Sequence, residues 1–356
     1  MTTQKTLDET LRAIEPASAQ AAQDAQHRWD SIAKPLNGLG LLEKAVVRLA
    51  GIQGTAQVDI SKRAVVVMCA DNGVVAEGVT QTDQEVTAIV TENMSKGDTS
   101  VCCMSRVAGA DVYPVDIGVY RPVAGEKISQ KCVRRGTRNM VEEPAMTREE
   151  AVKAIEVGIN AASELAGKGY KLLCTGEMGI GNTTTSSAVA AVLLDLPVAQ
   201  VTGRGAGLST AGLERKIRAI ETAVAKHRPD PNDPLDVLAK VGGLDIAGMA
   251  GVYLGGALCH VPVVVDGFIS AVAALVAARL CPAAGDYLVA SHVSKEPAGR
   301  MLLDALGIAP VIHGEMCLGE GTGAVALLPL LDMTLAVYTQ MPTFQDTAVE
   351  QYTPQV

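Results

Sequence analysis

Aromatic side chains are scarce in this chain of 356 residues, in which Phe, Trp and Tyr together make up only 3%. Apolar residues nevertheless account for 48%, so the core must be built mainly from Val, Ala, Leu, Ile and Met. Such aliphatic cores are typical of α/β proteins, in which buried parallel strands appear as continuous apolar runs. The composition therefore disfavours an immunoglobulin-like or barrel fold.

Positive charge is in short supply too. The chain has 30 Lys and Arg against 39 Asp and Glu, which leaves a formal net charge of −9. A nucleic-acid-binding surface needs concentrated positive charge to displace counterions. We therefore expect no nucleic-acid partner, and any anionic ligand must be held by local groups.

Signals of metal binding, disulfide bonding and membrane insertion are missing. The eight cysteines form no CxxC pair and share no metal-ligand spacing with the five histidines, so we expect reduced thiols in a cytoplasmic protein and no metal site. The stretch 1–16 lacks the apolar core of a secretory leader. The most apolar stretch, 261–283, is interrupted by Asp266 and Arg279, which predicts a buried strand and a buried helix rather than a membrane span.

Two patterns divide the chain. Residues 1–50 show helical periodicity, whereas from Lys62 onward short aliphatic runs alternate with helical segments. The predicted strands are Ala64–Cys69, Val112–Ile117, Lys171–Thr175, Pro262–Val265 and Tyr287–Ala290. The predicted helices include Glu85–Met94, Thr147–Leu165, Thr183–Leu194, Leu213–His227 and Ser270–Leu280.

The ends of two predicted helices carry capping signals. Thr147 and Glu150 form a capping box, and Asn182 is a natural N-cap for the helix that begins at Thr183. The alternation of strands and helices predicts βαβ units, and hence an α/β fold with a mostly parallel sheet covered by helices on both faces.

Polar residues follow each predicted strand at the point where it ends. The chain there reads Asp71-Asn72-Gly73, Asp116-Ile117-Gly118, Gly176-Glu177-Met178-Gly179, Asp266-Gly267 and Ser291-His292. Any one Asp-Gly pair could be an ordinary turn. Because the carboxyl ends of parallel strands lie along one edge of the sheet, five such endings predict an active site at that edge.

Two glycine-rich stretches are candidates for holding a phosphate. The first, GEMGIGNTTTSSA at 176–188, follows a strand and opens a helix, and it matches neither the Walker A loop nor GxGxxG. The second, VTGRGAGLS at 201–209, adds Arg204 and is followed by Lys216. A tight left-handed turn is the alternative for the first stretch. The candidate residues in and after these stretches are Gly176, Gly179, Gly181, Asn182, Thr183, Gly203, Arg204, Gly205 and Lys216.

Two carboxylates lie in glycine-rich loops and are the candidates for proton transfer. Glu177 lies next to Gly176, and Glu320 lies between Gly319 and Gly321 at the start of an apolar helix. A partly desolvated carboxylate facing a ligand has a raised pKa suited to accepting a proton. The alternative is that both are helix N-terminal carboxylates stabilised by the macrodipole.

At this point the chain resembles a known family, the nicotinate-nucleotide:5,6-dimethylbenzimidazole phosphoribosyltransferases of cobamide lower-ligand activation. The resemblance runs from about residue 34 to about residue 331 and keeps the family's motif order. The matching segments are VVVMCADNGVVAEGV (65–79), GEMGIGNTT (176–184), KVGGLDIAGMAGVYLG (240–255), PVVVDGF (262–268), SHVSKE (291–296) and LGEGTGA (318–324).

The resemblance implies a reaction, a set of residues and an assembly. A ring nitrogen of an aromatic base would attack the anomeric carbon of nicotinate mononucleotide, with no cofactor and no metal. Glu320 would be the general base and Glu177 would line the same site. Ribose and phosphate would be held by the glycine loops together with Lys216, Asp245, Asp266 and Ser294.

The resemblance also implies how the chain is organised. Family members are homodimers with a Rossmann-like large domain and a small helical domain built from both chain ends. We therefore expect residues 51–331 to form the large domain, and residues 1–50 with 332–356 to form the small one. The active site would borrow residues from the partner subunit, which is an identical chain or a paralogue.

The chain departs from the family pattern around the expected base pocket, for which the candidates are Thr82, Val90, Met178 and Leu318. Asn72 replaces the usual His, and Val90 replaces an amide that would hydrogen-bond the base. The acceptor could therefore be 5,6-dimethylbenzimidazole, another benzimidazole, a purine or a phenol. Two rivals stay open: a Rossmann-type dehydrogenase, disfavoured by the missing GxGxxG, and a catalytically weak paralogue that supports an active partner.

Overall fold

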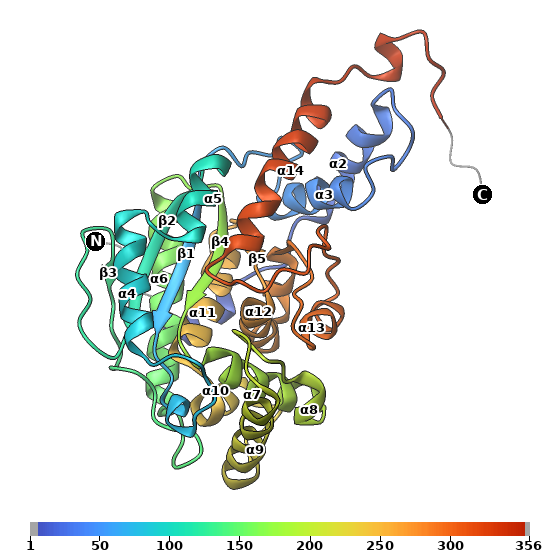
Figure 1. Cartoon of the computed structure of the whole chain (residues 1–356). Coiled ribbons are helices and arrows are strands. Elements are labelled where there is room, and N and C mark those ends of the chain that lie inside the picture. Colours follow the sequence, from blue (N-terminus) through green and yellow to red (C-terminus); the bar gives the residue numbers. More distant parts are fainter. Residues whose placement is uncertain (1–5, 353–356) are drawn as a thin grey trace.

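A six-stranded sheet forms the centre of the protein in a computed structural model, which describes residues 6–352 (Figure 1). The strands follow the order β3-β2-β1-β4-β5-β6, and every pairing between neighbours is parallel. The order reverses between β1 and β4, where an open parallel sheet leaves a crevice for ligands. The strands are β1 (Arg63–Ala70), β2 (Asp111–Gly118), β3 (Ser129–Gln130), β4 (Leu172–Met178), β5 (Val263–Val265) and β6 (Leu288–Ala290).

Helices cover both faces of the sheet, as the sequence predicts. On β1 successive side chains alternate between the faces. Met68 lies on the face of Gly248 in α11, whereas Val65 lies on the face of Gly321 at the start of α14. The α-helices are α1 (Leu7–Ala13), α2 (Ala19–Ser31), α3 (Leu41–Gln53), α4 (Glu85–Lys96), α5 (Ser100–Ala108), α6 (Arg148–Gly167), α7 (Asn182–Leu194), α8 (Val198–Val201), α9 (Thr210–His227), α10 (Pro234–Val241), α11 (Leu244–Leu258), α12 (Phe268–Leu280), α13 (Gly299–Ala305) and α14 (Thr322–Gln340). Three 3₁₀-helices complete the described elements: η1 (Gly73–Glu77), η2 (Pro282–Tyr287) and η3 (Phe344–Asp346).

The predicted strands and helices are all present, with boundaries shifted by a few residues. The capping box of Thr147 and Glu150 is confirmed. The N-cap prediction for Asn182 is wrong: Asn182 is the first residue of α7, and Gly181 caps the helix with a φ of 94°. The side-chain amide nitrogen of Asn182 instead donates hydrogen bonds to two carboxylates. The short strand β3 was not predicted.

The most apolar stretch folds as predicted into β5 and α12. Among the described residues, α14 is the one helix with the length and apolarity of a membrane span, and half of that stretch is buried inside the protein. Leu327, Leu328 and Leu331 are fully buried there. This burial is what a core helix of a folded domain shows.

A second, smaller hydrophobic cluster joins the two ends of the chain. It contains Ala25, Trp29 and Ile32 from the first segment, Val46 and Ala50 from α3, and Tyr338 from α14. Trp29 and Tyr338 pack with ring centroids 4.9 Å apart. Figure 1 shows α2, α3 and the end of α14 projecting together from the sheet. The cluster supports a small domain of residues 1–50 and 332–356, although α14 continues across that boundary; the division stays a prediction.

Candidate active site

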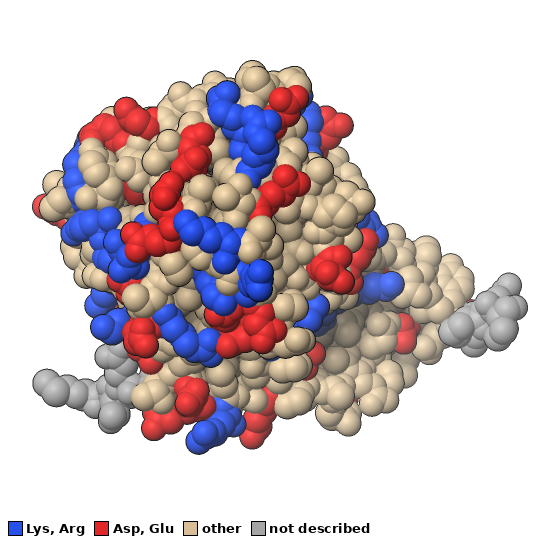
Figure 2. All heavy atoms as spheres, turned by 90° about the horizontal axis from the view of Figure 1, so that it is seen from below, with Lys and Arg blue, Asp and Glu red and all other residues tan. Residues whose placement is uncertain are grey.

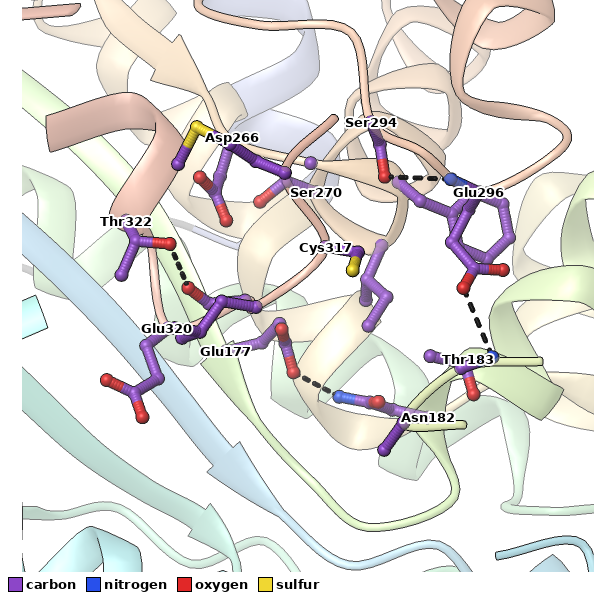
Figure 3. Close-up of a pocket in the computed structure, with 18 of the residues that line it drawn as sticks. Glu177, Asn182, Thr183, Asp266, Ser270, Ser294, Glu296, Cys317, Glu320 and Thr322 are labelled. Carbon is purple, nitrogen blue, oxygen red and sulfur yellow. Dashed lines mark hydrogen bonds between the residues drawn. The ribbon is translucent and has the colours of Figure 1, made fainter. Parts of the chain in front are cut away.

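A cavity opens at the carboxyl edge of the sheet, where β4, β5 and β6 end (Figure 3). Three of the strand endings singled out by sequence contribute to its wall, and α7, α12 and the loop before α14 complete it. Its lining residues are Glu177, Met178, Gly179, Ile180, Asn182, Thr183, Gly205, Ala206, Asp266, Gly267, Phe268, Ile269, Ser270, His292, Ser294, Glu296, Met316, Cys317, Leu318, Gly319, Glu320 and Thr322.

The turn between β4 and α7 needs its glycines because other backbone comes close. A Cβ at Gly179 would collide with the carbonyl oxygen of Ala70 at the end of β1. Gly181 has a φ of 94°, which side chains with a Cβ rarely adopt. The first stretch is thus a left-handed turn with close packing, and it also opens a 13-residue helix. Its role in holding a phosphate stays a prediction.

Two buried carboxyl groups, those of Glu177 and Asp245, share a partner behind this turn, and the charge of a third, Asp266, acts on Glu177. The side-chain amide nitrogen of Asn182 donates to Glu177 and, over 3.0 Å, to Oδ2 of Asp245. Burial raises the pKa of Glu177 to about 8, and the nearby charge of Asp245 adds to the effect. Burial also raises the pKa values of Asp245 and Asp266 to about 6. Glu177 therefore holds a proton near neutral pH, whereas Asp245 and Asp266 are largely ionised there, and such a mixture suits general acid-base chemistry.

Asp266 is held by the helix that follows the glutamate loop. Its Oδ1 accepts a hydrogen bond of 2.9 Å from the backbone N–H of Ala324 in the first turn of α14. Backbone N–H groups of Gly321, Gly323 and Gly267 lower its pKa and so partly oppose the effect of burial. The carboxylate thereby ties the end of β5 to the start of α14.

These raised pKa values predict that stability falls as the pH rises. A carboxyl group whose folded pKa lies above its ordinary value contributes stability that is complete below the ordinary value and is lost as the pH passes the folded value. For Glu177 that window runs from 4.5 to about 8. We expect the free energy of unfolding to fall by about 1 kcal/mol or more between pH 6 and pH 8.5, because one pKa unit corresponds to about 1.4 kcal/mol.

Urea unfolding at pH 6, 7 and 8.5 measures this slope. The variant Glu177→Gln should flatten this slope. Asp245 and Asp266, whose pKa values are about 6, contribute to the slope mainly below pH 7, and they do so in both proteins. Equal slopes in the wild type and in the variant over this range would contradict the expected pKa of Glu177.

Glu320 occupies a backbone conformation that its neighbours share. Its φ is 61°, and those of Gly319 and Gly321 are 93° and 94°. A non-glycine residue with positive φ is uncommon and is often kept for function. A Cβ at Gly176 would collide with the carbonyl oxygen of Glu320, and one at Gly319 would lie 2.6 Å from Oε1 of Glu177. The glycines thus allow β4 and the Glu320 loop to touch.

The carboxylate of Glu320 is aimed at α5. Its Oε2 accepts a hydrogen bond of 2.9 Å from the backbone N–H of Val101, in the first turn of that helix. In Figure 3 this carboxylate points away from the one of Glu177. Glu320 therefore does lie at the N-terminus of a helix, where the macrodipole favours a negative charge, but that helix is α5 and not its own.

A buried cation lies beside the second glycine stretch. The ammonium of Lys216 donates 2.8 Å to Oγ1 of Thr183 and 3.1 Å to the carbonyl of Gly203, and the residue is fully buried. Burial lowers its pKa to about 8, and the charge of Glu296 opposes that fall. Together with the N-terminus of α7, this corner can accept an anion in a protein of negative net charge.

Comparison with known proteins agrees on one family. A family model described as "Phosphoribosyltransferase" matches residues 14–349. The nicotinate-nucleotide–dimethylbenzimidazole phosphoribosyltransferase of Acetivibrio thermocellus is 48% identical over 98% of this chain and 100% of its own length, and that of Ruminiclostridium cellulolyticum is 46% identical over 98% and 99%. The crystal structure of CobT from Thermus thermophilus superposes with a TM-score of 0.89 at 40% identity and covers 94% of this chain and 100% of its own.

The chain belongs to the nicotinate-nucleotide–dimethylbenzimidazole phosphoribosyltransferase family. The resemblance inferred from motifs is thereby confirmed, and the alternative of a Rossmann-type dehydrogenase is excluded.

Most residues selected from the sequence of this phosphoribosyltransferase meet at the cavity. Those that line it are Glu177, Met178, Gly179, Asn182, Thr183, Gly205, Asp266, Ser294, Leu318, Gly319 and Glu320. Those that lie outside this lining but contact its members or border them in the chain are Gly176, Gly181, Gly203, Lys216, Asp245 and Gly321.

Three selected residues lie elsewhere. Thr82 and Val90 do not line the cavity in this chain, so their part in a base pocket stays a prediction. The guanidinium of Arg204 folds back on its own loop and donates to the carbonyl of Leu208 over 2.8 Å and to Thr210 over 3.2 Å.

Several lining residues escaped the sequence analysis. Glu296, Ser270, Met316 and Cys317 were given no binding or catalytic role, and His292 was named only as part of the polar ending of a predicted strand. Glu296 had a usable signal, because it lies in the SHVSKE segment that follows a predicted strand. Met316 and Cys317 had none, since only the folded loop before α14 brings them to the cavity.

Proposed function

We propose that the chain transfers the ribose 5-phosphate of nicotinate mononucleotide to an aromatic base, as the names of its relatives indicate for them. The products are nicotinate and an α-linked nucleotide phosphate for the cobamide nucleotide loop. The observation that carries the proposal is one cavity with the glycine loop on one side, behind which the ammonium of Lys216 is buried, and two glutamates on the other. The first side suits a phosphate and the second suits proton transfer.

The reaction needs few groups. A ring nitrogen of the base forms a bond to the anomeric carbon, while the bond to the nicotinate nitrogen breaks and its electron pair leaves with nicotinate. The proton on the attacking ring goes to a carboxylate, a role that we assign to Glu320. Glu177, which holds its own proton up to about pH 8, lies at the end of β4, against the loop that carries Glu320. Alignment of the two reactants supplies much of the rate enhancement.

The nucleotide is held, in this proposal, by the residues that the resemblance selected. Lys216 and the glycine loop take the phosphate, with Thr183 and Ser294 beside them. Asp245 and Asp266 face the ribose side as hydrogen-bond acceptors. Met178 and Leu318 line the part of the cavity that the aromatic base would enter, and the acceptor is 5,6-dimethylbenzimidazole or a related benzimidazole, purine or phenol.

We infer a dimer, formed with an identical chain or a paralogue, in the cytoplasm. Exposed apolar side chains on the projecting helices support a partner: Leu41 is 37% exposed and Met333 is 59% exposed, while Leu318 at the cavity is 58% exposed. All eight cysteines are free, in keeping with a reducing compartment. Over the described part of the face in Figure 2, acidic and basic side chains are interspersed, and such a surface offers little to a nucleic acid.

An assay of the purified chain tests the function. Given nicotinate mononucleotide and a panel of aromatic bases, the protein alone should release nicotinate and form a new nucleotide, detected by mass spectrometry, with a benzimidazole among the best acceptors. A dimethylbenzimidazole reaction lost in a heat-inactivated control shows that the enzyme is responsible. Release of nicotinate with none of the bases would overturn the proposal, and activity only with an added paralogue would favour the supporting-subunit alternative.

A further inference from the structure

The cavity contains a carboxylate where an anion is expected to bind, and the proposed reaction does not use it. Glu296 lines the cavity and lies close to Lys216, whose pKa its charge raises. A negative side chain next to a phosphate subsite repels the phosphate, so its presence needs a compensating role.

The contacts of Glu296 lead to the glycine loop. Its Oε1 accepts a hydrogen bond of 3.1 Å from the backbone N–H of Gly205, and its own N–H donates over 3.3 Å to Oγ of Ser294. Figure 3 shows the carboxylate of Glu296 extending from the Ser294 segment to the loop that passes beside Thr183. Two cavity walls that are 91 residues apart in sequence are joined here.

The approach is so close that it dictates the residue at position 203. A Cβ on Gly203 would collide with Oε2 of Glu296 and would lie 2.7 Å from Cδ of Pro297. At Gly205 the φ is 53°, and a Cβ would lie 2.8 Å from Oγ1 of Thr183. Gly205 is therefore needed for its backbone conformation, and a side chain at Gly203 would displace the Glu296 carboxylate or Pro297.

The loop held in this way also determines where Lys216 is. The ammonium of Lys216 is bonded to the carbonyl of Gly203 on that loop and to Thr183 on α7. Among the segments packed around Lys216, Glu296 supplies the charge that acts on its ammonium. The guanidinium of Arg204 is turned away, toward the carbonyl of Leu208. Glu296 therefore fixes the backbone donor of Gly205 and favours the charged form of Lys216.

We propose that Glu296 is a positioning residue for the phosphate subsite: it clamps the Gly203–Gly205 loop against the Ser294 segment and keeps Lys216 cationic. This inference rests on the proposed function, since it takes nicotinate mononucleotide as the ligand. It predicts an effect on binding of the nucleotide and little effect on the chemical step.

Two variants separate the charge of Glu296 from its clamp. Glu296→Gln can still accept from Gly205 but carries no charge, so the pH at which half of the nucleotide binding is lost should be lower than in the wild type, because Glu296 raises the pKa of Lys216. Glu296→Ala removes both, and KM for nicotinate mononucleotide should rise about tenfold or more, with kcat within about twofold of the wild type. Calorimetric titrations at pH 6.5, 7.5 and 8.5 and steady-state kinetics give both readouts.

The matched control is Glu315→Gln, which removes a charge from an exposed glutamate near the same segment, where Glu315 faces Lys295 at 3.5 Å. It should leave KM, kcat and the pH midpoint unchanged. Thermal unfolding shows whether Glu296→Ala still folds; if it does not, Glu296→Gln decides through the pH midpoint. Wild-type values in both variants would overturn the inference, as would a loss confined to kcat. A wild-type protein that binds no nucleotide would instead refute the proposed function.

Discussion

Replacing Glu320 by Gln should lower kcat by about 10²- to 10⁴-fold while the fold and nucleotide binding persist. Removing a general base costs a rate factor of this size. The amide oxygen of Gln can still accept the hydrogen bond from Val101, so the loop and α5 keep their contact. Steady-state release of nicotinate, followed by chromatography, gives kcat, and calorimetry gives the affinity for nicotinate mononucleotide.

Glu315→Gln is again the appropriate control, because Glu315 shares the unusual backbone of Glu320. Its φ is 50°, and its side chain is 84% exposed. The same chemical change there should alter kcat by less than twofold. Full activity of Glu320→Gln would move the base role to Glu177 or elsewhere, and a parallel loss of binding would show that Glu320 holds the substrate rather than taking its proton.

Replacing Gly158 by Ala should cost about 3 kcal/mol or more of stability, or prevent folding. A Cβ at this position would collide with the carbonyl oxygen of Gly248 and lie 2.7 Å from the backbone nitrogen of Val252. Gly251 faces the carbonyl of Ile155 in the same way. The backbones of α6 and α11 are therefore in contact, and neither can move without disturbing the sheet that α11 covers.

A second glycine on the same helix provides the control. Nothing lies within 4 Å of a Cβ at Gly167, so Gly167→Ala should stay within about 0.5 kcal/mol of the wild type, because an open helical position tolerates Ala well. Urea unfolding measures both variants, with soluble yield as a first readout. Similar stabilities of the two variants would contradict the tight α6–α11 contact.

Local sequence was enough to predict the framework of the sheet. Runs such as VVVMC at 65–69 are aliphatic on both sides because both faces of β1 are covered, and every residue of β1 is buried. The two-residue strand β3 has too little pattern to be recognised. The glycines of α11 were noted only as part of a family motif, since their reason is the α6 backbone, which lies elsewhere in the chain.

The site was predicted less completely than the sheet. The polar endings of β4, β5 and β6 do meet at one edge, as parallel strands require. Asn182 was expected to cap a helix, but it is the first residue of α7, and its amide nitrogen donates to two carboxylates. Thr82 and Val90 were selected because the chain departs from the family pattern there, and they lie outside the described cavity lining. The role of Glu296 follows only from its contact with a loop that sequence analysis treated separately.

The amino-acid sequence by itself determined the α/β class, the edge of the sheet at which the cavity opens, the glycine loops and the family. Tertiary structure alone decided how these parts act on one another. Asn182 meets Asp245 across 63 residues, and Val101 meets Glu320 across 219. The physical reason is that desolvation, and with it the pKa of Glu177 near 8, depends on which distant segments exclude water. The local sequence around Glu177 does not show which distant segments pack against it.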